Sequence, residues 1–276
     1  MDFWYRFSRS PQAVASLVFV GVVLLLALAA PLVAGADPQA GSPNALQPPL
    51  SPGAVLGTDH LGRDIWAQLV YGSRVSLTVG GLAAISALAI GVVVGALAGF
   101  FGGVVDATLM RISELFQTLP RFVLALIIVA LFGAGLLKLI AVIAILSWPQ
   151  TARVVRASFL SLREAPFVDA ARVGGMGSFS IIVREALPNV LAPIVVTGSL
   201  DVAAAILLEA GLGFFGLGDP NLVSWGGMLN QAQQYLRQAW WMSLFPGLAI
   251  SLVVLAFNII GDGLNDALNP RLREAG

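Results

Sequence analysis

The chain alternates between long apolar runs and shorter polar segments. Six runs have about twenty residues or more, which is the length that a helix needs to cross a bilayer. They lie near residues 13–34, 74–101, 118–137, 139–160, 189–211 and 243–263. Because lipid cannot satisfy free backbone polar groups, each run is expected to be helical. The pattern predicts an all-α integral membrane protein with six transmembrane helices.

The second run, "VGGLAAISALAIGVVVGALAGFFGG", is rich in glycine and alanine. Small residues allow the backbones of membrane helices to approach each other closely. We therefore expect another helix to pack tightly against this run.

The first run raises the alternative of a cleaved signal peptide. Arg6 and Arg9 precede it, and the small-residue sequence "AGA" follows it. The apolar part of a signal peptide has about 7–15 residues, whereas this run has about twenty. We expect an uncleaved first transmembrane helix.

Composition agrees with a membrane protein and excludes several other classes. The chain is 58% hydrophobic and 11% charged, with a mean hydropathy of +0.88, whereas soluble domains have about half apolar and about a quarter charged residues. A net charge of zero and a single lysine give no indication of nucleic-acid binding. The lack of cysteine excludes disulfides and thiolate chemistry. One histidine, His60, cannot form a multi-histidine metal site.

The distribution of basic residues predicts the orientation. With the N-terminus in the cytoplasm, eleven arginines fall on the cytoplasmic side, and three arginines and one lysine fall on the outer side. The positive-inside rule therefore favours two cytoplasmic termini. The cytoplasmic set is Arg6, Arg9, Arg111, Arg121, Arg153, Arg156, Arg163, Arg172, Arg184, Arg271 and Arg273, and the outer set is Arg63, Arg74, Lys138 and Arg237.

One cytoplasmic segment, "DAARVGGMGSFSIIVREALP" (169–188), is long, charged and rich in glycine. Residues 162–173 are predicted to form a short helix that Gly174 and Gly175 end. Ser178 is expected to cap a second helix that runs to about Leu187. Pro188 then breaks that helix or starts the fifth span. The segment is predicted to be a helix–turn–helix outside the membrane.

This segment resembles the EAA loop of the membrane subunits of bacterial ABC importers. That pattern is Glu-Ala-Ala, three residues, Gly, nine residues and Ile-x-Leu-Pro. Asp169-Ala170-Ala171 matches its beginning, Gly175 matches its glycine, and Leu187-Pro188 matches its end. Asp replaces the first Glu, and Glu185 occupies the isoleucine position. The second departure weakens the match in the second helix.

Four further stretches resemble the second permease subunit of dipeptide, oligopeptide, nickel and glutathione importers. They are "LGTDHLGRDIWAQLVYGSRVSLTVG" (56–80), "LEAGLGFFGLG" (208–218), "SWGGML" (224–229) and "FNIIGDGLNDALNPRLR" (257–273). The resemblance implies a MetI-like, type I importer permease fold. We expect an N-terminal segment with the first helix and an outer loop (1–73), and a five-helix core (74–276) that contains the coupling loop (about 162–188).

The resemblance also implies partners. The coupling helix would dock on a separate ATPase through Asp169, Ala170, Ala171, Arg172, Gly175, Leu187 and Pro188. The expected complex contains a homologous permease, two ATP-binding subunits with ATP and Mg, and an extracytoplasmic solute-binding protein, in the cytoplasmic (inner) membrane of a bacterium or archaeon. The only lysine, Lys138 in "GAGLLKL", is not part of a P-loop. This chain is therefore expected to bind no cofactor and to be no enzyme.

Peptide is the expected cargo, and nickel or glutathione are the alternatives within the same family. An alternative of another class is a self-sufficient proton-coupled carrier or channel in which Asp201 and Glu209 form a relay. Carriers of that kind often contain repeated halves, and no internal repeat is evident in the sequence.

Polar residues elsewhere allow two readings each. Asp201 and Glu209 in the fifth span either line the translocation path or form structural hydrogen bonds with another helix. Asp59, Arg63 and Asp64 either form a structural network or contact the partner permease or binding protein, and a metal site there is disfavoured. The outer tryptophans, Trp225, Trp240 and Trp241, are expected to be interfacial anchors, with receptor docking as the alternative.

Overall fold

The computed structural model describes residues 2–35 and 37–268, and within these residues the regular secondary structure is helical. Arg271 and Arg273 of the charge count, and the end of the 257–273 motif, lie outside the described residues. The helices are α1 (Asp2–Ser8), α2 (Pro11–Leu28), α3 (Ala30–Val33), α4 (Ile65–Phe101), α5 (Gly103–Leu115), α6 (Arg121–Phe132), α7 (Leu136–Leu162), α8 (Pro166–Val173), α9 (Ser178–Ser180), a π-helical turn (Ile181–Ala186), α10 (Leu187–Asn189), α11 (Leu191–Phe214), α12 (Trp225–Ala232), a 3₁₀ turn (Gln233–Tyr235) and α13 (Trp241–Leu268).

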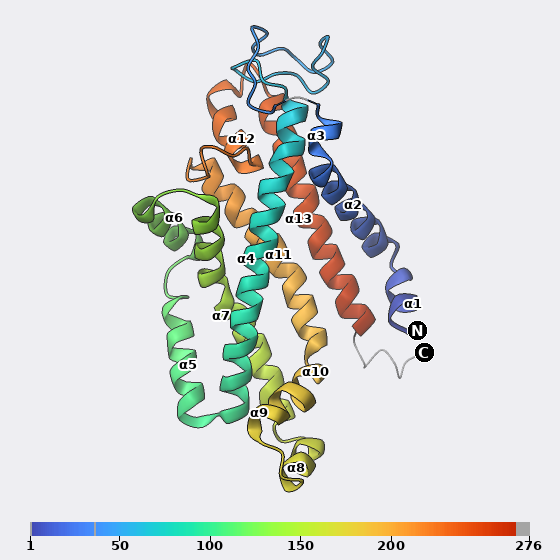
Figure 1. Cartoon of the computed structure of the whole chain (residues 1–276), viewed down its shortest axis with the longest axis vertical. Coiled ribbons are helices and arrows are strands. Elements are labelled where there is room, and N and C mark those ends of the chain that lie inside the picture. Colours follow the sequence, from blue (N-terminus) through green and yellow to red (C-terminus); the bar gives the residue numbers. More distant parts are fainter. Residues whose placement is uncertain (1, 36, 269–276) are drawn as a thin grey trace.

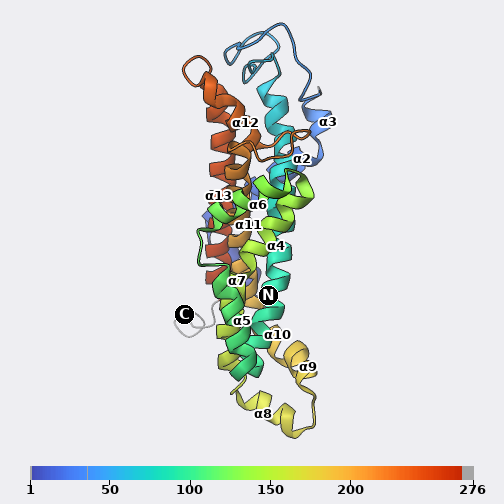
Figure 2. The same ribbon diagram turned by 90° about the vertical axis from the view of Figure 1, so that its left-hand side faces the viewer.

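The long helices lie side by side along the long axis of the molecule (Figures 1 and 2). The loop that precedes α4 and the α12 region lie at one end, and α8 lies at the other (Figure 1). Among the described residues, five helices are long and apolar enough to cross a membrane: α2, α4, α7, α11 and α13. The all-α, multi-pass prediction is confirmed.

The third predicted span, 118–137, is not one continuous helix. α6 has 12 residues, about 18 Å at ~1.5 Å per residue, whereas the hydrocarbon core is about 30 Å thick. α5 precedes it, and the two helices together carry the chain from the α8 end back toward the α12 end (Figure 1). The polar "QTLP" before Arg121 interrupts the run, since Pro120 stands just before α6 and Thr118 donates to the Leu115 carbonyl. The third predicted span is thus one short apolar helix, α6, with an interruption before it.

α4 begins at Ile65, earlier than predicted, because Asp64 caps its N-terminus by accepting a hydrogen bond from the Trp66 N–H at 3.1 Å. Residue 74, where the sequence places the start of the core, therefore lies inside α4. The division at 73/74 stays a prediction.

α4 and α7 pack closely through glycines. A methyl group at Gly95 would lie 2.5 Å from the Ala152 carbonyl oxygen and 2.8 Å from Val155 Cβ. One at Gly99 would lie 2.6 Å from Phe159 Cβ. The expected close packing of the glycine-rich run is confirmed, and its partner is α7.

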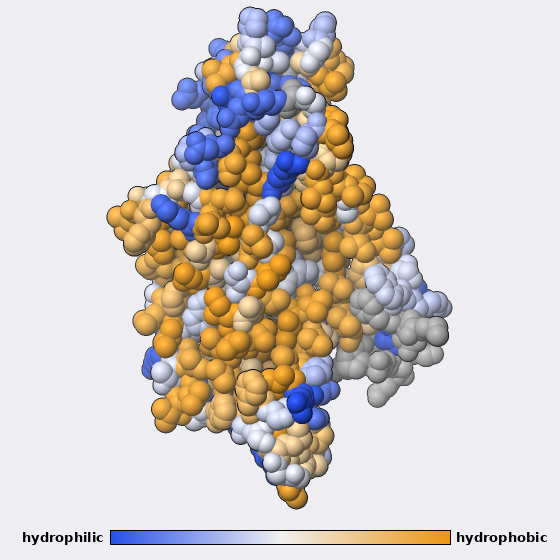
Figure 3. Space-filling view, in the orientation of Figure 1, coloured by the Kyte–Doolittle hydropathy of each residue, from blue (hydrophilic) through white to orange (hydrophobic). Residues whose placement is uncertain are grey.

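The surface has the polarity that a membrane requires. On the face that Figure 3 shows, hydrophobic residues cover the middle of the molecule, and hydrophilic residues gather at the α12 end. Exposed Leu25 on α2, Leu131 on α6 and Leu255 on α13 belong to the apolar surface. In water such an area would be unfavourable, whereas lipid covers it without cost.

Candidate functional site

The segment between α7 and α11 folds into a helical hairpin at the extreme end of the molecule (Figures 1 and 2). α8 begins at Pro166 and not at residue 162, because a proline is well suited to the first turn of a helix. α8 ends in a Schellman motif: the Gly175 N–H donates to the Arg172 carbonyl and the Met176 N–H to the Ala171 carbonyl, both at 3.0 Å. Gly175 has φ +80°, which glycine adopts readily.

The second half of the hairpin differs from the prediction. Gly177, and not Ser178, is the capping residue, and Ser178 is the first residue of α9. Pro188 lies inside α10 and does not end the helical path, which bends at Val190 and continues as α11. The π-helical turn precedes this proline, and the Asn189 side chain donates to the Glu185 carbonyl at 2.6 Å. The Asn189 side chain thus satisfies a backbone carbonyl close to the proline.

Buried side chains fasten the hairpin to the transmembrane helices. Val168 on α8 is fully buried and belongs to one apolar cluster with Ile181, Ile182 and Ala186 of the hairpin. Ala96 and Phe100 from α4, Val155 and Phe159 from α7, and Val190 and Ile194 at the start of α11 complete the buried part of this cluster. A rigid movement of α8 would therefore act directly on α7 and α11.

The opposite side of the hairpin is exposed. Phe167, Ala170, Val173 and Phe179 are exposed, with Val173 91% and Phe179 79% accessible. The helix that carries three of these residues, α8, lies at the far end of the molecule (Figure 2). Small residues, Ala170 and Gly174, lie among them. Exposed apolar residues of this kind are typical of surfaces that contact other proteins or membranes.

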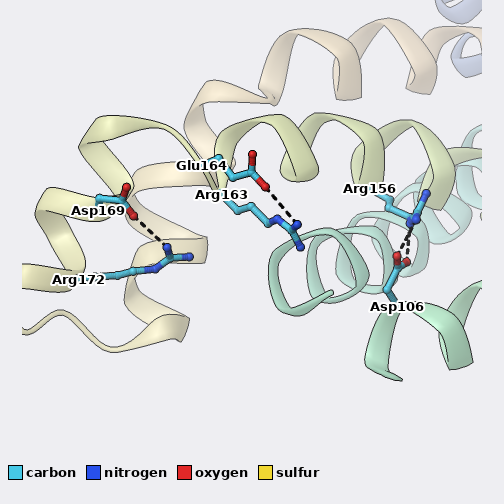
Figure 4. A network of polar contacts seen from close by, with 6 residues as sticks. All are labelled: Asp106, Arg156, Arg163, Glu164, Asp169 and Arg172. Carbon is cyan, nitrogen blue, oxygen red and sulfur yellow. Dashed lines mark hydrogen bonds and ion pairs between the residues drawn. The ribbon is translucent and has the colours of Figure 1, made fainter. Parts of the chain in front are cut away.

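Charged residues form ion pairs within the hairpin and among its supporting helices (Figure 4). Arg172 donates to Asp169 at 3.0 Å, and its guanidinium lies 5.6 Å from the centre of the Phe100 ring. Nε and Nη2 of Arg156 donate to the two carboxylate oxygens of Asp106 at 2.5 and 2.6 Å, which joins α7 to α5. The hydrogen bonds from Arg156 hold the pKa of Asp106 below its usual value.

We predict that Asp106→Ala lowers the free energy of unfolding by about 2 kcal/mol, since it removes a bidentate, charge-assisted pair. The two side chains are 16% and 32% exposed. Because the folded-state pKa of Asp106 is lowered, this contribution is present above the unfolded pKa, about 3.9, and is lost as pH falls through the folded value. Thermal unfolding in detergent at several pH values measures it.

Glu114→Ala is the matched control, because the Arg111–Glu114 pair is 84% and 52% exposed and contributes little. Arg156→Gln and the double variant complete a thermodynamic cycle. Additive effects of the two single substitutions would contradict a direct stabilising interaction between Asp106 and Arg156.

The two acids of the fifth span are buried and hydrogen-bonded to other helices. The Thr151 hydroxyl on α7 donates to Asp201 at 2.7 Å, and the Ser76 hydroxyl on α4 donates to Glu209 at 3.0 Å. Asp201 is 4% exposed and Glu209 is 1% exposed. These hydrogen bonds agree with the alternative in which Asp201 and Glu209 have a structural role. The hypothesis that the acids line the path stays a prediction.

In the outer loop, Asp59 organises the backbone. Its carboxylate accepts hydrogen bonds from the N–H groups of Leu61 and Arg63 at 2.8 and 2.9 Å, and from the Gln68 side chain at 2.9 Å. The predicted network of Arg63 with an acid is therefore formed by the backbone N–H of Arg63 and not by its side chain. The Nε atom of Arg63 is buried and has no hydrogen-bond partner. His60 stacks on Tyr235 with ring centroids 4.9 Å apart. Within residues 2–35 and 37–268, no group of three or more potential metal ligands occurs.

The tryptophan prediction is wrong for two of the three residues. Trp225 and Trp241 are buried, and their indole N–H groups donate to the carbonyls of Leu69 and Thr58. They hold the α12 region and the start of α13 against α4 and the outer loop. Trp240 is exposed, as an interfacial anchor would be.

Comparison with known proteins gives two family matches. Residues 91–274 match the family described as the inner membrane component of binding-protein-dependent transport systems. Residues 1–49 match the N-terminal transmembrane domain of oligopeptide transport permease C.

Curated relatives match over nearly the whole chain. The di/tripeptide permease DppC of Pseudomonas aeruginosa is 39% identical over 99% of this chain and 93% of its own. The dipeptide permease DppC of Alkalihalophilus pseudofirmus is 41% identical over 97% and 88%. The glutathione permease GsiD of Pectobacterium atrosepticum is 37% identical over 99% and 91%.

Among solved structures, a chain of the MetNI methionine ABC transporter in an inward-facing conformation has the same fold. The TM-score is 0.60 with 22% identity, and the match covers 74% of this chain and 97% of that one. The predicted MetI-like architecture is confirmed at the level of the fold.

Proposed function

The chain belongs to the family of binding-protein-dependent transport inner membrane components, and from this membership we propose that it carries di- and oligopeptides across the membrane together with a homologous permease. It is a permease subunit of an ABC transporter. The observation that carries the peptide cargo is the 39–41% identity to dipeptide permeases over 97–99% of the chain. Glutathione is the alternative cargo that a 37% identical relative supports. Nickel remains the other alternative, and the self-sufficient carrier is set aside.

We propose that the hairpin docks on a separate ATP-binding subunit. The residues assigned to this contact are Asp169, Ala170, Ala171, Arg172, Gly175, Leu187 and Pro188. Exposed Phe167, Val173 and Phe179 support the assignment, because they would otherwise present an apolar surface to water. Buried Val168 supports the transmission of movement to α7 and α11. Asp169 and Arg172 act as a pair within α8.

ATP hydrolysis is assigned to two partner subunits, which would bind ATP and Mg. This chain carries no P-loop sequence. Its only lysine, Lys138, donates to the Phe132 carbonyl at 2.8 Å and thereby completes the end of α6. Because this lysine has a structural role, we assign no ATP hydrolysis to this chain and propose that it acts as a translocation subunit.

We propose that α8 and both ends of the chain face the cytoplasm of a bacterium or archaeon. Two arginines of the sequence count, Arg121 and Arg153, lie close to α7 Ser147 and are left out of the orientation count. The remaining excess of arginines still favours this direction. The outer loop would contact an extracytoplasmic binding protein or the partner permease. Asp59 and Asp64 shape this loop, while the side chain of Arg63 retains a donor without a partner.

The proposed function predicts ATP-dependent peptide uptake by the assembled complex. The complex, reconstituted in proteoliposomes, is expected to accumulate a labelled dipeptide only when both ATP and the binding protein are present. Competition with glutathione and with nickel separates the alternative cargoes. Uptake by this chain without an ATPase subunit would contradict the proposal.

A further inference from the structure

A groove of about 560 Å³ lies between the α5–α6 connection and α7. Figure 2 turns this side toward the viewer and shows the connection at mid-height in the molecule. The polar side chains that line the groove are Gln117, Arg121, Ser147, Gln150 and Arg153. None of the described residues that line it is acidic.

The groove lies within the depth of the membrane. Arg121 Nη1 donates to the Ser147 hydroxyl at 3.4 Å. One turn further along α7, Thr151 donates to Asp201, which lies near the middle of the membrane-spanning helix α11. Gln150 and Arg153 on α7 are exposed at this level. Exposed polar side chains at such a depth face a water-filled path or another protein, because lipid would not solvate them.

The backbone at the groove gives the same indication independently. The chain is not helical between Leu115 and Arg121, so some of its N–H and C=O groups lack helical partners. Irregular backbone at membrane depth is tolerated where it borders protein or a water-filled cavity, and not where it borders lipid. α6 also begins here without a side-chain cap, which leaves the positive end of its dipole in the groove wall.

The groove is suited to an anion. Arg121 and Arg153 supply two guanidinium groups, and in the part of the chain that the structure describes neither forms an ion pair with a carboxylate. The acid near Arg121, Asp201, is buried and bonded to Thr151. Guanidinium groups bind carboxylates through paired hydrogen bonds, and the amides of Gln117 and Gln150 provide further donors.

We propose that this groove is part of the translocation path and binds the carboxylate of the transported peptide through Arg121 and Arg153. The inference rests on the proposed peptide cargo, since every unmodified peptide carries a C-terminal carboxylate. The phosphate of an acidic lipid has the same oxyanion chemistry, and the experiment separates the two sources.

The lack of cysteine in this chain permits a direct test. Gln150→Cys is introduced into the complete complex, whose other subunits are cysteine-free, and is labelled with anionic and cationic methanethiosulfonate reagents. We expect the anionic reagent to react, and its rate to fall about tenfold when Arg153→Gln is added, since a basic site concentrates anions. A transported dipeptide, with ATP and binding protein, is expected to slow the labelling. Leu255→Cys, on the lipid-exposed side of α13, is the unreactive control.

Three outcomes overturn the inference: no reaction at Gln150→Cys with either reagent, a rate unaffected by Arg153→Gln, or a rate that responds to acidic lipid and not to peptide. Uptake gives an independent measurement. Arg153→Gln is expected to reduce uptake about tenfold and Arg153→Lys to restore part of it, while ATPase subunits stay bound. If the wild-type complex takes up no peptide, the proposed function fails. If it does, and Arg153→Gln is equally active, only the groove assignment fails.

Discussion

Replacing Gly175 by valine is expected to abolish peptide uptake while the chain still inserts into the membrane. Gly175 has φ +80°, a left-handed conformation that costs an ordinary residue about 1–2 kcal/mol and a β-branched residue more. Its strain would break the Schellman hydrogen bonds to Arg172 and Ala171, and would turn α8 away from its direction. A misdirected α8 could not dock on an ATPase. Uptake into proteoliposomes and copurification of the ATPase subunits measure the effect.

Gly177→Val is a matched control two residues away. A Cβ at either glycine would meet no atom within 4 Å, but Gly177 has φ −68°, which valine adopts without strain. Gly175→Asn is expected to retain most of the uptake, because asparagine tolerates the left-handed conformation. If valine at 175 and valine at 177 have equal effects, the backbone conformation of Gly175 is not what the segment requires.

The hairpin could be predicted from sequence because its signals are local. Glycine ends α8, and the alternation of apolar and charged residues gives helices on both sides. The start of α8 can also be predicted from neighbouring residues, since Pro166 is a strong signal for a first helical turn. The helical path through Pro188 cannot be predicted in this way, because the π-helical turn and the Asn189 contact depend on how α11 packs.

In the third predicted span, by contrast, the hydropathy pattern misses the local signals that end and start helices. Counting apolar residues over 118–137 hides the effect of Thr118 and Pro120, which end one helix and begin the next. Hydropathy averages over a window, whereas helix ends depend on single residues. The interruption proved to be the feature that places Arg121 at the groove. The departure from the hydropathy pattern therefore coincides with the groove proposed above as a binding site.

The sequence alone does not predict which residues of different helices contact each other. Asp106 and Arg156 are fifty residues apart, as are Thr151 and Asp201, and nothing local marks them as partners. The sequence predicts Trp225 and Trp241 to be surface anchors, because it shows an aromatic residue near a helix end but not its burial. Each of these contacts depends on which helices become neighbours, and that is decided by close packing.

Gly95→Leu is expected to prevent stable folding of the α4–α7 pair. A Cβ at this position would lie 2.5 Å from the Ala152 carbonyl oxygen, and α7 backbone cannot move aside without separating the two helices. Separation would also disturb the Thr151–Asp201 hydrogen bond and the apolar cluster that holds the hairpin. Overpacking of a close contact costs about 1–3 kcal/mol and more for a large side chain. The amount of folded protein in membranes and its thermal unfolding in detergent measure this loss.

Gly81→Leu tests whether position or residue type decides the outcome. Gly81 lies in the same helix, but a Cβ there would meet no atom within 4 Å. We expect Gly81→Leu to fold like the unaltered chain, and Gly95→Ala to be less harmful than Gly95→Leu, because the disturbance grows with the volume inserted between the helices. Equal stability of the two leucine variants would mean that α4 and α7 do not approach each other as closely as the structure places them.

The close spacing of α4 and α7 also supports the hairpin, since α7 leads directly into α8. A partly folded Gly95→Ala chain should therefore lose uptake together with stability, and not retain full uptake at reduced stability.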